Sequence, residues 1–102
     1  MAGTATFEFS GLLWRYPGDG GWHFVSLPAE ISAEITDIGG GARRGFGSLR
    51  VAVRVGATSW NTSVFPDTKT GTYLLPVNQA VRIAEQLEDG DEVNAELQLS
   101  DL

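Results

Sequence analysis

The sequence predicts a mainly β protein, a small closed β-barrel of six to seven strands that also carries two short α-helices. Apolar and polar residues alternate strictly at 49–55 and 93–99, which is the pattern of a strand with one buried face. Turn segments rich in Gly, Pro and Asp, "PGDGG" and "FPDTKTG", separate the strand patterns. A Leu-Pro pair that leads into an amphipathic stretch occurs twice, at Leu27 and again 48 positions later at Leu75.

The first half begins with a long strand pattern at 4–16. Gly11 interrupts its alternation, which indicates a bulge or a bend at that point. The segment at 22–27 is the returning strand of a hairpin. Pro28 then suits the first turn of a helix, where its missing N–H has no cost. Three isoleucines follow it at the spacing of one helix face, namely Ile31, Ile35 and Ile38.

The alternating strand at 49–55 is the return strand of the first half. The second half repeats this order, with a strand at 58–65, a Pro/Asp/Gly turn and a short strand at 72–75. Pro76 lies near the start of the second predicted helix, and the last strand follows at 93–99. The apolar stripe of that helix consists of Val77, Ala80, Val81, Ala84 and Leu87.

Superposing the two Leu-Pro pairs gives both halves the same sequence of a hairpin strand, a Leu-Pro pair, a helix and a return strand. This repetition predicts an internal duplication with an approximate two-fold axis. Each half leaves one sheet face uncovered, so the two halves would bury those faces against each other in one closed barrel. We expect a single domain over residues 1–102, as either a monomer or a homodimer.

The composition excludes several classes of function. The net charge of −6, with 13 acidic and 7 basic residues, disfavours attraction to nucleic acid or anionic lipid. The absence of cysteine excludes disulfides and thiolate metal sites, and a single histidine excludes a multi-histidine site, so we expect no metal or other cofactor. The start of the chain lacks signal-peptide features, and the longest apolar runs are far shorter than a membrane span, so the cytoplasm is the expected compartment.

The motifs around the two Leu-Pro pairs resemble a bacterial family known as the domain of unknown function numbered 1905. The first half carries "W.F..LP", at Trp22, Phe24, Leu27 and Pro28, and the second carries "VRVGATSWNTSVFP" and "YLLP…AVR…L…GDEV…L". The resemblance implies a double-split β-barrel, distantly similar to the swapped-hairpin barrels of AbrB- and MazE-type regulators. It implies no activity. Ile83 stands where the family pattern has a second basic residue.

Four further patterns have a structural explanation that the residues favour. "GGGARRGFG" (39–47) has the glycines of a phosphate loop but follows a helix, which favours a flexible loop. His23 is a candidate general base, yet its strand position favours a surface residue. Ser26 or Ser63 could form a Ser-His-Asp arrangement with His23, but no nucleophile-elbow motif GxSxG supports such a catalytic triad. "EDGDE" (88–92) offers carboxylates for a hard cation without calcium-loop spacing, which favours a turn.

The surroundings of Trp60 predict the one candidate site. Trp60 precedes Thr62 and Ser63, and an amphipathic aromatic beside hydroxyl groups is typical of a small pocket. Arg82 directly follows Val81 on the second predicted helix. Its side chain therefore lies off the apolar stripe and can reach back toward a neighbouring strand. We therefore predict that Trp60, Thr62, Ser63 and Arg82 form a ligand-binding cleft that suits a carboxylate or phosphate group.

Each part of this prediction has an alternative. The alternative for Trp60 is a core tryptophan on an edge strand, with polar neighbours that face solvent. Arg82 is alternatively a surface residue that forms an ion pair with Glu85 or Asp89, which contributes little to stability. The two readings differ in whether Arg82 and Trp60 lie on the same side of the barrel.

Three classes of function follow from these observations. The first is a non-enzymatic binding module for a small ligand, anionic in the cleft described, or for a protein partner. The second is a DNA-binding regulator by analogy with the AbrB-like barrel, although the acidic balance opposes nucleic acid as a partner. The third is an enzyme with unconventional residues, although paired bases, a metal cluster and a nucleophile motif are missing.

Overall fold

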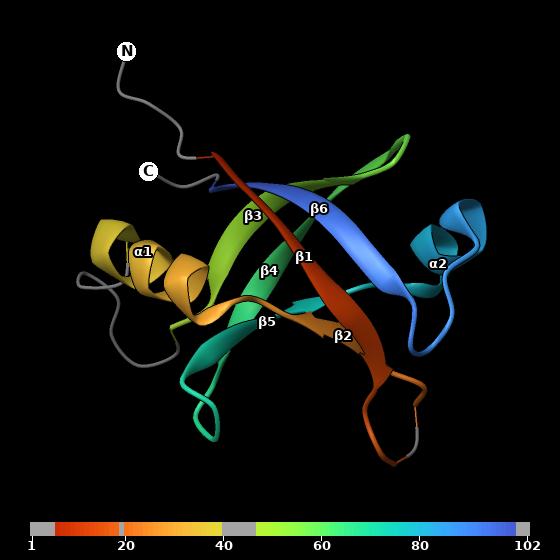
Figure 1. Cartoon of the computed structure of the whole chain (residues 1–102), viewed down its shortest axis with the longest axis horizontal. Coiled ribbons are helices and arrows are strands. Elements are labelled where there is room, and N and C mark those ends of the chain that lie inside the picture. The colour runs from red at the N-terminus through yellow and green to blue at the C-terminus, as the bar shows by residue number, and fades with distance from the viewer. Residues whose placement is uncertain (1–5, 19, 40–46, 100–102) are drawn as a thin grey trace.

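The computed structural model describes residues 6–18, 20–39 and 47–99 (Figure 1). This part of the chain contains six strands and two helices. They are β1 (Thr6–Arg15), β2 (His23–Ser26), α1 (Ala29–Gly39), β3 (Leu49–Val55), β4 (Thr58–Asp67), β5 (Thr72–Pro76), α2 (Gln79–Glu85) and β6 (Glu92–Leu99). The expectations for "GGGARRGFG" fall largely on 40–46, which lie outside the described residues.

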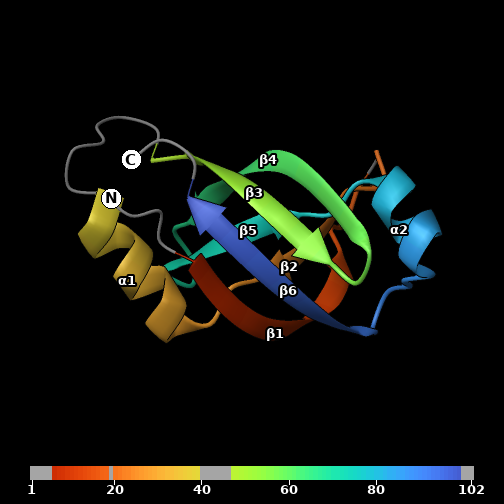
Figure 2. The same cartoon turned by 90° about the horizontal axis from the view of Figure 1, so that it is seen from above.

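The six strands form a closed antiparallel barrel in the order β1-β2-β5-β4-β3-β6, which confirms the predicted fold class. A single copy of the chain closes this barrel. The two helices lie at opposite ends of it (Figure 2). Within the described ranges, neither helix is long and apolar enough to cross a membrane.

Two long strands divide their length between two partners each. β1 pairs with β6 up to Leu12 and with β2 from Leu13 onward. β4 likewise pairs with β3 up to Val64 and with β5 from Phe65 onward. The barrel therefore opens locally wherever a long strand exchanges one partner for the other.

Gly11 marks this exchange in β1. The register with β6 runs unbroken from Thr6 to Leu12, so Gly11 forms no bulge against β6. A Cβ atom at Gly11 would lie 2.8 Å from Cγ1 of Val25 and 3.1 Å from the carbonyl oxygen of Ser26. Glycine is needed here because β2 passes too close to β1 for any side chain.

The predicted duplication appears in both connectivity and register. Each half runs strand, strand, helix, strand, with β4, β5, α2 and β6 in the places of β1, β2, α1 and β3. Val25 pairs with Leu75, and the exchanged pair is also present, because the N–H of Leu27 donates to the carbonyl oxygen of Tyr73 at 2.9 Å. The two Leu-Pro pairs thus occupy equivalent places between a strand and a helix.

The core fills the barrel with side chains from alternate strand positions, as the period-two patterns predict. The helices close the two ends unequally. α1 buries Ile35 and Ser32, and the Ser32 hydroxyl accepts a hydrogen bond from the backbone N–H of Tyr73 at 3.1 Å. α2 buries only Val81, since it ends early at Gln86, which adopts a left-handed conformation. Of the stripe predicted for this helix, Val77 and Val81 are buried, Leu87 is half-buried against the core, and Ala80 and Ala84 are exposed.

Candidate functional site

A cleft opens at the α2 end of the barrel, where β4 and β5 diverge. β4 leaves β5 before Phe65 to follow β3, whereas β5 continues along β2 as far as Pro76. The β1–β2 turn and α2 border the gap, which has a volume of about 400 Å³. The residues around it are Gly20, Gly21, Trp22, His23, Trp60, Thr62, Phe65, Pro76, Val77, Asn78, Gln79 and Arg82.

Three of the four predicted site residues meet in this cleft. Trp60 and Thr62 stand opposite Val53 and Val51 of β3, so both face the barrel interior, and both are half-buried. Arg82 reaches the cleft from α2. Whether the cleft binds a ligand stays a prediction.

Ser63 is not among the lining residues, contrary to the sequence-based expectation. It is adjacent to Thr62, and successive strand residues point to opposite faces. Its cross-strand partner on β3 is the exposed Arg50, on the outward side of the sheet. Ser63 therefore belongs to the outer surface and not to the cleft.

Arg82 is held by the backbone and not by an acidic neighbour. Its Nε–H donates to the carbonyl oxygen of Val77 at 3.1 Å. No ion pair of Arg82 occurs within the described ranges, and the two acids proposed as partners are engaged elsewhere. Glu85 accepts from the Thr58 hydroxyl at 2.6 Å, and Asp89 accepts from the N–H of Arg15 at 3.2 Å. The terminal amino groups of Arg82 are thereby left available to an anion.

α2 is fixed at both ends, which sets the position of Arg82. At the start, the side-chain oxygen of Asn78 accepts from the N–H of Val81 at 3.0 Å and caps the helix. At the other end, the Glu85 carboxylate accepts from the N–H of Ala57 at 3.2 Å as well as from Thr58. The second contact attaches the helix to the β3–β4 turn.

His23 and Trp22 line the cleft as well, and sequence reasoning had not assigned them to it. His23 is half-buried, and its Nδ1 lies 2.7 Å from the carbonyl oxygen of Gly21. A carbonyl only accepts, so Nδ1 carries the proton and Nε2 is left for other contacts. The sequence signal that could have indicated the position of His23 is its spacing from Val25. Residues two apart on a strand face the same side, and Val25 is buried in the core.

The charge of the cleft is opposite in sign to that of the whole chain. The sequence has 13 acidic and 7 basic residues, yet the described residues that line the cleft include Arg82 and no Asp or Glu. Hydrogen-bonding side chains of Thr62, Asn78 and Gln79 surround it together with two indoles. This combination offers donors and a positive charge to an anionic group.

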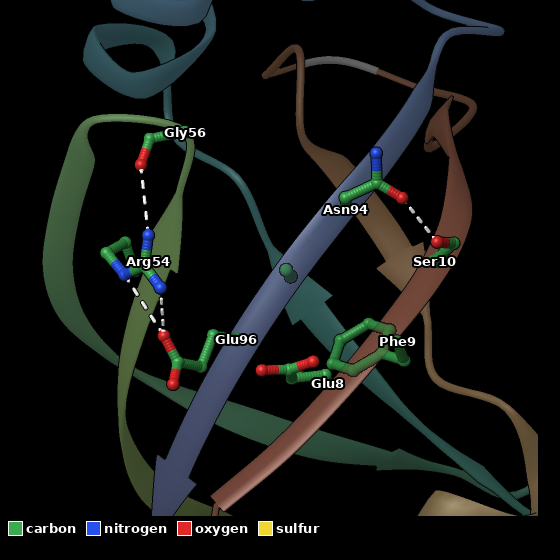
Figure 3. Close-up of a pocket in the computed structure, with 8 residues that line it drawn as sticks. Glu8, Phe9, Ser10, Arg54, Gly56, Asn94 and Glu96 are labelled. Atoms are coloured by element: carbon green, nitrogen blue, oxygen red, sulfur yellow. Dashed lines mark hydrogen bonds and ion pairs between the residues drawn. The ribbon is translucent and has the colours of Figure 1, made fainter.

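A second hollow on the outer face of β1, β6 and β3 differs in this respect (Figure 3). There the guanidinium of Arg54 donates from Nε to the Glu96 carboxylate at 3.0 Å and from a terminal amino group to the carbonyl oxygen of Gly56 at 3.4 Å. Glu8 stands directly opposite Glu96 on the neighbouring strand. The carboxylates thus outnumber the cation, and this hollow is a solvated polar surface.

The acidic run at 88–92 serves a turn. The Asp91 carboxylate accepts from the N–H of Glu88 at 2.8 Å, and Gly90 has a positive φ of 95°. In the part of the chain that the structure describes, no group of three or more His, Asp or Glu side chains is arranged to hold a metal ion.

A family model described as "Domain of unknown function (DUF1905)" matches residues 9–97, a range that contains every residue of the cleft. A search of curated proteins finds no match.

Proposed function

The chain belongs to the DUF1905 family, as its motifs predict, and because this family defines no activity, we propose from the geometry of the cleft that the domain binds a small anionic ligand. The observation that carries the proposal is Arg82, which is half-buried, is held through Nε by a backbone carbonyl, and lines a cleft whose described residues include no Asp or Glu. A carboxylate or phosphate group would accept from this guanidinium in a two-bond, planar arrangement.

The proposal is for binding without chemical conversion. The described lining of the cleft has one imidazole, His23, and no carboxylate to orient it as a general base. Thr62 supplies a hydroxyl and Trp60 an apolar wall with a single N–H donor, which are groups that position a ligand. A partially enclosed volume of about 400 Å³ is within the range of small-molecule sites.

Inorganic phosphate is the probe that tests this site. Binding with a Kd of about 1 mM would stabilise the protein by about 1.4 kcal/mol at 10 mM, or about 6 °C in Tm for a domain of this size. We expect Arg82→Gln to remove this shift. The matched control is Arg54→Gln, because Arg54 is an exposed arginine already paired with Glu96. A shift that survives in Arg82→Gln, or that Arg54→Gln removes equally, contradicts the proposal.

We also expect no useful binding to duplex DNA at physiological salt. Phosphate neutralisation needs several convergent cations, and Arg54 on β3 is already paired with Glu96. Arg50 lies on the same outward face of β3 as Arg54. The residue opposite it on β4 is Ser63, which carries no charge. A mobility-shift assay with random genomic fragments at 150 mM salt measures this directly. A salt-dependent shift at submicromolar protein would contradict it.

A further inference from the structure

A cluster of exposed aromatic side chains lies on the outer face of the barrel, over β1, β2, β5 and β4. Trp22 is 58% exposed, Tyr16 51% and Phe65 43%. Together with Phe24 and Leu74 they enclose another hollow, of about 310 Å³, whose surface is entirely apolar. We call it the aromatic hollow. Grouped exposed aromatics of this size are characteristic of interaction sites, since water solvates them poorly.

The rings of this cluster are ordered by one another. Trp22 and Phe24 stack with their centroids 6.0 Å apart and their planes 7° from parallel. The ring of Tyr16 meets that of Phe24 edge-on, with the centroids 6.0 Å apart. The ring of Trp14, on β1, lies with its centroid 5.4 Å from that of Phe24. Such contacts give a preformed apolar surface, so a ligand that lies on it has little ordering cost.

The aromatic hollow and the cleft of Arg82 are adjacent. Trp22 and Phe65 line both of them. The two adjacent hollows, together called the groove, have a cationic, hydrogen-bonding end at Arg82 and an apolar end at Phe24 and Leu74. A ligand that fills the whole groove must be anionic at one end and flat and apolar at the other.

We propose that the ligand of this domain is a small planar aromatic molecule with one carboxylate or phosphate group, the anion at Arg82 and the ring system against Trp22 and Phe65. The proposal rests on the proposed function and specifies its ligand class. Volumes of about 400 and 310 Å³ suit a small molecule.

The test compares 2-naphthoate with acetate and with 2-naphthylmethylammonium by isothermal titration calorimetry on the whole chain. We expect 2-naphthoate to bind at least about 10-fold more tightly than either, since only it satisfies both ends of the groove. Trp22→Ala should weaken 2-naphthoate at least about 10-fold. Leu74→Ala, at a residue that lines only the aromatic hollow, should weaken 2-naphthoate and leave the phosphate-induced shift unchanged, whereas Arg82→Gln should weaken both. Leu12→Ala is the control, an exposed apolar residue that lines neither hollow.

The outcomes separate this inference from the proposed function. If phosphate binding depends on Arg82 but 2-naphthoate binds no more tightly than acetate, the aromatic ligand class is wrong and the anion site stands. If 2-naphthoate binds equally in Arg82→Gln, or if the cationic analogue binds as well, the anion site is wrong too. Loss of affinity in Leu12→Ala equal to that in Trp22→Ala would also overturn the inference. Thermal unfolding of each variant shows whether it is folded under the binding conditions.

Discussion

Replacing Leu75 with alanine is expected to lower the free energy of unfolding by about 3 kcal/mol, because it leaves a cavity in a core that cannot collapse around it. Leu75 has no exposed surface and stands opposite Val25, which is also fully buried. The pair lies at the contact between the two halves of the barrel. Urea denaturation measures the loss, and Tm should fall by more than about 10 °C.

Leu74→Ala is the matched control for this result. Leu74 is adjacent on β5 but points outward and is half-buried, so its truncation should cost less than about 1 kcal/mol. Because Leu74 lines the aromatic hollow, the same variant should weaken 2-naphthoate instead. Leu27, the equivalent of Leu75 in the first half, should reproduce the larger stability loss. Equal losses from Leu74 and Leu75 would contradict the assignment of faces.

The barrel was predictable because its strands carry a strong local signal. Residues at alternate positions of 49–55 and 93–99 are buried as the pattern requires, and the duplication follows from the repeated Leu-Pro pair. The second helix was predicted less well. Its apolar stripe spans 77–87, yet helix geometry is limited to Gln79–Glu85, since Gln86 takes a left-handed conformation that composition does not reveal.

The site was predictable where it depends on strand parity. Trp60 and Thr62 share a face, and Arg82 reaches that face from the helix that follows β5. The same parity rule places Ser63 on the opposite face of the strand, because it is adjacent to Thr62. His23 and Trp22 come from the other half of the chain, and their place beside Arg82 depends on the β2–β5 pairing, which no local pattern specifies.

The two halves of the duplicated barrel differ in how the described side chains fill them, and the cleft lies at the α2 end. On β1 the barrel-facing Phe7 and Phe9 are 7% and 8% exposed, whereas on β4 the barrel-facing Trp60 and Thr62 remain half-buried. α1 inserts Ile35 into its end of the barrel, while α2 inserts only Val81. One end of a symmetric scaffold is filled with apolar side chains, and the other keeps space that polar groups line.

The Glu85 carboxylate attaches the end of α2 to the β3–β4 turn beside Gly56. A Cβ atom on Gly56 would overlap this carboxylate, and Gly56 has a φ of 60°. Gly56→Ala is therefore expected to lower the free energy of unfolding by about 2.5 kcal/mol. About 1 kcal/mol comes from the left-handed backbone, and the rest from displacing the carboxylate that accepts from Ala57 and Thr58.

Gly71→Ala separates these two causes. Gly71 has a φ of 75° in the β4–β5 turn, and nothing lies within 4 Å of a Cβ atom placed there, so this variant reports the backbone cost alone. In a double-mutant cycle, Gly56→Ala made in a Glu85→Ala background should cost only as much as Gly71→Ala. Gly56→Ala should also weaken phosphate binding at Arg82 without touching the cleft, whereas Gly71→Ala should not. If Gly56→Ala costs the same with and without Glu85, the contact does not hold α2 in place.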